Sequence, residues 1–347
     1  MGALWSGEDR SPPPDTWRLD HEREARCAGE PAGGAVRWAV RLSTWRVGAP
    51  PPPHRSREFE WLRTALVREP AERDRVLEFK FEADRRRALL ARLLARRCCA
   101  RALGAPATIA RTAGGKPFAA AGGARPFPNF NFNISHEGDF VVVASEPLCL
   151  VGVDVCCADR ARGPNRAPPD LEELGHYAVA FSQDEWTALV LVGDGEKRFD
   201  HFRSLWACKE AYVKARGDGL AFDLNRVTFV ALARGGRGPF SAAAVVVDGF
   251  RDDRWRVDVE ALDADHIAAV CRGPCAEARD EAGAFAATMA EPDAGATISR
   301  AWRAAVAEPR AAFSVVGADD LVPEDLRPEH AAVRSAGFAG PWGGAVS

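Results

Sequence analysis

The sequence predicts an α+β fold with two domains and tails, and three observations support this prediction. The chain has 347 residues, which suits two modest domains better than one large one, because a domain usually holds roughly 100–200 residues. Hydrophobic residues make up 47% and charged residues 27%, enough apolar material for the cores of a soluble globular protein. Segments with strand-like alternation and segments with helix-like periodicity both occur between residues 36 and 271.

The first domain is expected to contain an early strand, a helical region and two further strands. Every second residue from Val36 to Leu42 is apolar, as in a half-buried strand. A helical pattern begins near Arg73, and Asp84 is the expected N-cap of a helix that carries leucines on one side. The further strands are expected over residues 130–136 and 140–144.

The second domain is expected to combine helices with a larger number of strands. A strong helical pattern over residues 199–216 stops at Gly217, a typical helix terminator. Other helical stretches are expected over residues 171–181 and 183–192, and strands over residues 148–155, 226–232, 242–247, 255–262 and 267–271.

These elements divide the chain into four parts. Residues 1–34 are polar and punctuated by Pro and Gly, which predicts a disordered leader. Residues 35–145 and 146–272 form the two α+β halves. Residues 273–347 are rich in Ala, Glu and Pro and show little strand periodicity, so a weakly ordered tail is expected there.

Composition excludes or disfavours several classes of protein. No apolar run approaches the roughly 18 residues that span a bilayer, and the start of the chain lacks the apolar stretch of a secretory signal. The net charge of −3 disfavours a nucleic-acid binder, which is usually basic. The 9 cysteines include no C-x-x-C motif, which favours reduced thiols in the cytoplasm.

The basic residues are strongly skewed, since 41 of the 46 are Arg and only 5 are Lys, and Asn is equally scarce at 5. Such a skew is typical of GC-rich codons rather than of function. Three of the five Lys and three of the five Asn nevertheless lie in short, structured-looking segments. These first candidates for a specific role are Lys116, Lys209, Lys214, Asn129, Asn131 and Asn133.

An acid lies inside the apolar strand expected over residues 148–155. Alternation places Gly152, Asp154 and Cys156 on one face and three valines on the other. One interpretation is an edge-strand aspartate that faces water. The other is a ligand for a hard metal, with Gly152 leaving space for a ligand to approach the backbone.

Glu210 and Lys214 lie one helical turn apart on a half-apolar helix face. They could form a surface ion pair worth roughly 0.2–0.5 kcal/mol, or they could serve a metal-plus-phosphate site, where Lys acts as a point charge. Between Arg111 and Lys116 two cations bracket a Gly-Gly turn whose backbone N–H groups can face an anion. An ordinary basic turn is the alternative.

Ser135 and His136 suggest a hydrolase only superficially. Neighbouring residues of a strand point to opposite faces, so His136 cannot activate Ser135 as in a catalytic triad.

Three segments taken together resemble the ordered motifs of the 4′-phosphopantetheinyl transferases. They are NFNISHEGD from Asn131, VGVDV from Val151 and WACKEAYVK from Trp206. The pattern is specific, because it combines G-[IV]-D, W-x-x-K-E-[AS] at this spacing after it, and N-[IV]-S-H upstream. RWAV from Arg37, RTAGGKP from Arg111 and PNFNFNISH from Pro128 are similar to the animal members. The resemblance covers about residues 35–272.

The resemblance implies two similar α+β halves related by a pseudo-twofold axis, with the active site in the cleft between them and the boundary near residue 145. It implies coenzyme A as donor and a carrier-protein serine as acceptor. The expected acceptors are acyl carrier protein and the carrier domains of fatty acid synthase and aminoadipate-semialdehyde dehydrogenase type enzymes. The expected enzyme is a monomeric, Mg²⁺-dependent holo-[acyl-carrier-protein] synthase that releases adenosine 3′,5′-bisphosphate, with neither nucleic acid nor membrane as partner.

By motif matching, the resemblance assigns Asp154 and Glu210 to Mg²⁺, which takes one or two carboxylates and completes its shell with phosphate oxygens and water. Glu210, Asp154 and Lys214 are the expected catalytic residues, and Glu210 deprotonates the serine directly or through a metal-bound water. The residues expected to contact coenzyme A are Arg75, Arg111, Thr112, Ala113, Gly114, Gly115, Lys116, Asn133, Ile134, Ser135, His136, Asp154, Glu210, Ala211, Tyr212, Val213 and Lys214. Arg92, on the leucine-bearing helix, is expected to be an ordinary surface charge.

One position departs from the family pattern. Many bacterial members carry a second acid two residues after the aspartate, and Cys156 stands there in this chain. A thiol is too soft for Mg²⁺, so a water is expected to fill that position. A non-catalytic coenzyme A or carrier-protein binder on the same scaffold is the alternative function.

Overall fold

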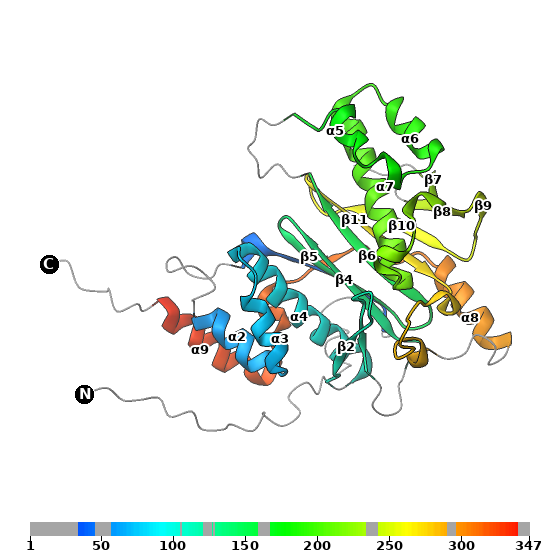
Figure 1. Cartoon of the computed structure of the whole chain (residues 1–347). Helices are drawn as coiled ribbons and strands as arrows, with labels where there is room; N and C mark the ends of the chain where they lie inside the picture. Colours follow the sequence, from blue (N-terminus) through cyan, green and yellow to red (C-terminus); the bar gives the residue numbers. More distant parts are fainter. Residues whose placement is uncertain are drawn as a thin grey trace, which may run out of the picture.

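Two sheets stack face to face, and each is covered on its outer side by one helix of 22 residues (Figure 1). The computed structural model describes residues 34–45, 57–104, 106–120, 127, 129–158, 167–233, 242–289 and 296–338. The order of the layers is α4, the first sheet, the second sheet and α7. The expected α+β class with two similar halves is confirmed.

The first half contains a four-stranded sheet in the order β12-β1-β5-β4. Its own elements are β1 (Val36–Arg41), α2 (Arg57–Leu66), α3 (Pro70–Leu77), α4 (Glu82–Leu103), β2 (Ile109–Arg111), β3 (Pro117–Ala119), β4 (Asn131–Glu137) and β5 (Phe140–Glu146). The expected N-cap at Asp84 is wrong, because α4 begins at Glu82 after Phe81. Asp84 lies in the first turn instead and pairs with Arg87 at 2.7 Å, where an acid also favours the helix dipole.

The second half contains the sheet β6-β11-β10-β8-β7, with β9 beside β8. Its elements are β6 (Leu150–Cys157), α5 (Leu171–Gly175), α6 (Gln183–Val190), α7 (Gly195–Arg216), β7 (Val227–Ala233), β8 (Ala242–Val247), β9 (Phe250–Arg251), β10 (Arg256–Ala261) and β11 (His266–Gly273). The helix expected over residues 171–181 is split into α5 and a short 3₁₀ turn. Gly217 ends α7 with a φ of +95°, as its position predicted.

The alternating residues of β5 and β6 hold the layers together. Val141 and Val143 of β5 pack toward α4, while its other apolar residues face the valines of β6. On the opposite face of β6, a Cβ at Gly152 would lie 2.1 Å from the carbonyl oxygen of Ala211. The lack of a side chain at Gly152 therefore allows α7 to pack directly against β6. The interpretation that Gly152 leaves space for a ligand is wrong.

Side chains, rather than backbone pairing, join β4 to β6. β6 is an edge strand of its sheet, and four of its backbone N–H groups each donate to a side chain that lies 20 residues earlier on β4. The bonds are Val151 N to Asn131 Oδ1 (2.9 Å), Val153 N to Asn133 Oδ1 (3.0 Å), Val155 N to Ser135 Oγ (3.3 Å) and Cys157 N to Glu137 Oε2 (3.1 Å). We call this set the side-chain ladder.

The C-terminal region is built into the fold, so the expectation of weak order across residues 273–347 is wrong for much of it. It forms α8 (Ala296–Ala307), β12 (Ser314–Val315) and α9 (Arg327–Phe338). β12 pairs in parallel with β1, and α9 packs on α2, where His330 lies 3.1 Å from the buried Glu58 (Figure 1). A strand of two residues has no periodicity from which it could be predicted.

The leader expected over residues 1–34 lies outside the described residues except for Gly34. Among the helices that the structure describes, none is long and apolar enough to cross a membrane.

Removing the C-terminal elements should destabilise the whole fold. A chain that ends at residue 290 loses β12, which pairs with β1, and His330, which pairs with Glu58. It also loses the Ala305 and Glu308 carbonyls, to which the fully buried Arg272 donates. We expect the free energy of unfolding to fall by about 3 kcal/mol or more, because buried charges lose partners. Chemical denaturation of both chains measures this, and equal stability would show that the C-terminal region is dispensable.

The side-chain ladder should contribute directly to stability. In Asn131→Leu the Val151 N–H loses its acceptor and the Cys149 carbonyl loses a donor at 2.7 Å. Each buried group left without a partner costs about 1–3 kcal/mol, so the melting temperature should drop. The exposed Asn225 supplies the control, since Asn225→Leu should change stability by less than about 0.5 kcal/mol.

Candidate functional site

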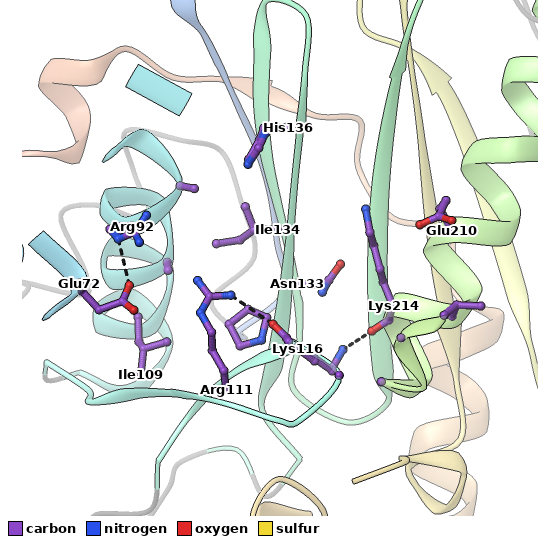
Figure 2. A pocket seen from close by; sticks show the side chains of 18 of the residues that line it. Glu72, Arg92, Ile109, Arg111, Lys116, Asn133, Ile134, His136, Glu210 and Lys214 are labelled. Atoms are coloured by element: carbon purple, nitrogen blue, oxygen red, sulfur yellow. Dashed lines mark hydrogen bonds and ion pairs between the residues drawn. The ribbon is translucent and has the colours of Figure 1, made fainter. Parts of the chain in front are cut away.

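A cavity of about 540 Å³ lies where the two halves meet (Figure 2). Its wall comes from α4, the β2–β3 turn, β4 and the C-terminal part of α7. The structure brings these expected site residues to its lining: Arg111, Gly114, Gly115, Lys116, Asn133, Ile134, His136, Glu210, Val213 and Lys214.

Asp154 lies beside this cavity and forms hydrogen bonds with Lys214, which lines it, and with Ser135, an expected coenzyme A residue that does not. Its Oδ1 accepts from Ser135 Oγ at 2.8 Å and from Lys214 Nζ at 2.5 Å. The residue is 6% exposed, so the interpretation of a water-facing edge aspartate is wrong. Ser135 bonds Asp154 and not His136, in agreement with the rejection of a catalytic triad.

Lys214 carries the charge that compensates Asp154. Its Nζ also lies 3.2 Å from Ser135 Oγ. Burial alone would lower the pKa of Lys214, but the Asp154 carboxylate outweighs burial and raises it. The ammonium therefore stays protonated at the edge of the cavity, where an anion can reach it.

Glu210 lines the cavity one turn before Lys214, and the two do not form the surface ion pair that their spacing allowed (Figure 2). Burial raises the pKa of Glu210, Lys214 opposes this, and the nearby Asp154 adds to it. Within the described part of the chain its carboxylate forms no hydrogen bond or ion pair. The carboxylate is therefore available to a ligand.

The donor set around Asp154 and Glu210 suits a hard divalent cation. Two carboxylates are the ligands that Mg²⁺ usually takes from a protein, and the Lys214 ammonium already places a positive charge against Asp154. Burial raises the pKa of the Cys156 thiol well above its usual value. Cys156 therefore stays a neutral thiol and adds no ligand.

Lys116 points its charge away from the cavity. Its Nζ donates to the carbonyl oxygens of Val151 at 2.7 Å and Lys214 at 2.8 Å, joining β6 to the end of α7 (Figure 2). The residue is 4% exposed, and burial lowers its pKa to about 7. Lys116 thus braces the two walls of the site, and its contact with coenzyme A stays a prediction.

The glycine turn beside Lys116 packs closely against α7. A Cβ at Gly114 would lie 2.5 Å from the carbonyl oxygen of Gly217, so only glycine fits there. Arg111 is exposed and bonds the Gly115 carbonyl at 3.1 Å. The segment is a tight hairpin turn that presents the Arg111 side chain to the cavity (Figure 2).

Several expected coenzyme A residues lie outside the lining. Ala211 and Tyr212 are packed in the core of the second half, and Thr112 is buried in the hairpin with its hydroxyl bonded to Lys116 N. Ala113 lies on the exposed turn without lining the cavity. The Arg75 side chain is 59% exposed on α3 and pairs with Glu72 at 3.2 Å.

Two arginines that the sequence reasoning missed do line the cavity. Arg92 and Arg96 of α4 have side chains only 11% and 10% exposed, so the expectation that Arg92 is an ordinary surface charge is wrong. Their spacing of four residues places them on one face of the helix, next to the small Ala91 and Ala95. That pattern was visible in the sequence.

Comparison with known proteins gives matches to both halves. Residues 54–148 match the family 4′-phosphopantetheinyl transferase, N-terminal, and residues 150–271 match the 4′-phosphopantetheinyl transferase superfamily. The L-aminoadipate-semialdehyde dehydrogenase-phosphopantetheinyl transferase of Homo sapiens is 34% identical over 248 residues, 69% of this chain and 75% of that protein. The Rattus norvegicus protein of the same name is 33% identical over 241 residues, 68% and 74% of the two chains. A phosphopantetheinyl transferase of Thraustochytrium sp. is 36% identical over 249 residues, which cover 69% of this chain and 79% of that protein.

The chain therefore belongs to the 4′-phosphopantetheinyl transferase superfamily, which confirms the resemblance carried by its three motifs. The two matched segments adjoin between residues 148 and 150. The chain passes there from β5 of the first sheet to β6 of the second. The family boundary and the structural boundary thus coincide.

Lys116 should contribute more to the stability of the fold than to the binding of a negatively charged ligand. Lys116→Met leaves the Val151 and Lys214 carbonyls without their buried donor, which should lower the free energy of unfolding by about 1–3 kcal/mol. Arg111→Ala, at an exposed side chain of the same turn, should leave stability unchanged. Urea denaturation of both variants tests this, and a fully stable Lys116→Met would contradict the bracing role.

Proposed function

We propose that the chain transfers the 4′-phosphopantetheine arm of coenzyme A to a serine of an acyl carrier protein or carrier domain, releasing adenosine 3′,5′-bisphosphate. One observation carries the proposal: the cavity has Glu210 and Lys214 at one end and a group of arginines at the other (Figure 2). Coenzyme A carries phosphate at two separate positions, a pyrophosphate and a 3′-phosphate. Its two phosphate positions match a cavity that has the Lys214 ammonium at one end and arginines at the other.

Family membership supports the reaction class, and the names of the relatives suggest the acceptor. The rat and human relatives are named for aminoadipate-semialdehyde dehydrogenase. We therefore propose carrier domains of that type, acyl carrier protein and the carrier domain of fatty acid synthase as acceptors. A holo-[acyl-carrier-protein] synthase activity follows. We propose that the chain acts as a monomer. The eight described cysteines form no disulfide, which suits the cytoplasm.

The chain's own residues suffice for positioning and proton transfer. The serine oxygen attacks the phosphorus that bears the pantetheine arm, and the bond from that phosphorus to the bridging oxygen breaks as the adenosine bisphosphate leaves. Glu210 takes the serine proton, because its carboxylate has no hydrogen bond or ion pair within the described part of the chain and lies at the cavity. Lys214 turns from Asp154 toward the phosphates and stabilises the leaving charge.

Mg²⁺ would be held by Asp154 and Glu210, and when bound it neutralises the phosphate charge. Ser135 fixes the Asp154 carboxylate through its 2.8 Å hydrogen bond. The Ser135 hydroxyl in turn accepts from Val155 N in the side-chain ladder. The orientation of the metal ligand thus depends on the contact between the two halves.

Transfer can be tested with apo acyl carrier protein, coenzyme A and Mg²⁺. The wild-type chain should add the mass of one phosphopantetheine arm to the carrier, and a chelator should stop the reaction. Asp154→Ala and Glu210→Ala should each reduce turnover more than tenfold, a loss above about 1.4 kcal/mol, because each removes a charge that positions the cation. Intact-mass spectrometry measures the product, with melting curves to verify folding.

A matched control is Glu60→Ala, which removes a helical carboxylate paired with Arg63 outside the cavity. It should retain full turnover. A wild-type chain that binds coenzyme A but adds no mass to any apo carrier would instead identify a non-catalytic binder.

A further inference from the structure

A second group of metal-ligating side chains lies outside the cavity lining, where α9 packs on α2 (Figure 1). It consists of Glu58 of α2, Asp319 of the 3₁₀ turn Ala318–Leu321, and His330 of α9. Each residue offers one ligand atom, and these three atoms lie within 4.8 Å of one another. Glu58 and His330 are 272 residues apart in the sequence, so only the folded chain brings the group together.

Two of the three side chains are withdrawn from water. Glu58 and His330 are each 4% exposed, and His330 Nε2 lies 3.1 Å from Glu58 Oε1. The Asp319 side chain is 58% exposed, and its Oδ1 lies 3.8 Å from His330 Nδ1. The group thus has two buried members and one open side, through which an ion and a water ligand can enter.

Neighbouring aromatic residues hold the two buried members. Trp45 Nε1 donates to Glu58 Oε1 at 3.3 Å, and carboxylates that bind metals are usually fixed by such outer hydrogen bonds. The Trp61 ring stacks on His330, with the ring centroids 5.2 Å apart. Glu58 and His330 therefore have defined positions before an ion binds.

A single arginine compensates the two carboxylates, and it does so from the exposed side. Arg334 Nη1 lies 2.5 Å from Asp319 Oδ2, and Arg334 Nε lies 4.0 Å from Glu58 Oε1. The Arg334 side chain is 35% exposed, so its guanidinium can turn into water. A divalent cation among the three ligands would compensate both carboxylates and release Arg334.

We propose that Glu58, Asp319 and His330 bind Zn²⁺. This ion takes imidazole nitrogen and carboxylate oxygen ligands at about 2.0–2.2 Å, and a water completes its shell when the protein supplies three ligands. The imidazole favours Zn²⁺ over Mg²⁺, which prefers oxygen ligands. Zn²⁺ thus replaces Arg334 as the compensating charge and fastens α9 to α2, at a site separate from the cavity.

A metal site behaves differently from a group of ion pairs that only holds α9 in place. If the ion pairs only stabilise packing, Arg334→Gln lowers stability and zinc has no effect on any variant. If Zn²⁺ competes with Arg334, the same substitution strengthens zinc binding, because a positive charge leaves the site. The two cases therefore differ in the response of Arg334→Gln to zinc.

The test is calorimetric titration of the chelator-treated full chain with zinc chloride, in an excess of Mg²⁺. We expect one zinc ion to bind per chain. His330→Gln and Asp319→Asn should each weaken this binding at least tenfold, and Arg334→Gln should strengthen it severalfold. Zinc should also raise the melting temperature of the wild type by several degrees, because it binds the folded state, and should not raise that of His330→Gln.

Two variants serve as controls. His176→Gln removes an exposed histidine of the second half, and Asp154→Ala removes the acid beside the cavity. Both should bind zinc at this site as the wild type does. If His330→Gln fails to fold, Asp319→Asn decides, because its side chain is exposed.

Three results would overturn the inference. They are a wild-type chain that binds no zinc, zinc binding that survives both His330→Gln and Asp319→Asn, and zinc binding that is lost in Asp154→Ala. None of these measurements depends on transfer from coenzyme A, so the zinc site and the proposed function stand or fall separately.

Discussion

The side-chain ladder between β4 and β6 is the interaction on which the rest of the molecule depends. It satisfies the N–H groups of an edge strand, and it fixes the position of one half against the other by four contacts of equal sequence spacing. A shift of one residue would turn the polar side chains of β4 into the apolar core. Because Ser135 belongs to the ladder and also bonds Asp154, the same contacts that join the halves orient the acid of the site.

Buried ion pairs strengthen the same interface away from the cavity. Asp258 of β10 accepts from Arg37 of β1 at 2.8 Å and from Arg272 at 3.1 Å. Glu146, at the end of β5, lies between Arg272 and Arg310. These charges stay compensated only while both halves and the segment after α8 are in place. The cavity therefore lies in an interface held by directional contacts as well as by apolar packing.

Much of the fold and part of the site could be predicted from the sequence. Helix and strand periodicity predicted most elements, and Gly217 predicted the end of α7. The resemblance to the transferase motifs predicted that Asp154, Glu210 and Lys214 share one site. The role of Lys116 could not be predicted, because its carbonyl partners lie on β6 and α7 and leave no pattern in its own turn. Arg92 differs from Lys116, because its spacing from Arg96 was visible in the sequence, but its position in the cavity depends on how α3 and α4 pack.

The pairing of β12 with β1 joins residues far apart in the chain, with Trp38 opposite Ser314. During synthesis, β1 leaves the ribosome long before its partner is made. One edge of the first sheet therefore stays open until Val315 has been translated, and an open strand edge is a template for association with other chains. By contrast, the ladder partners lie 20 residues apart and can meet early. The order of translation thus makes completion of the first sheet a late folding event, and truncated or stalled chains the forms most prone to aggregation.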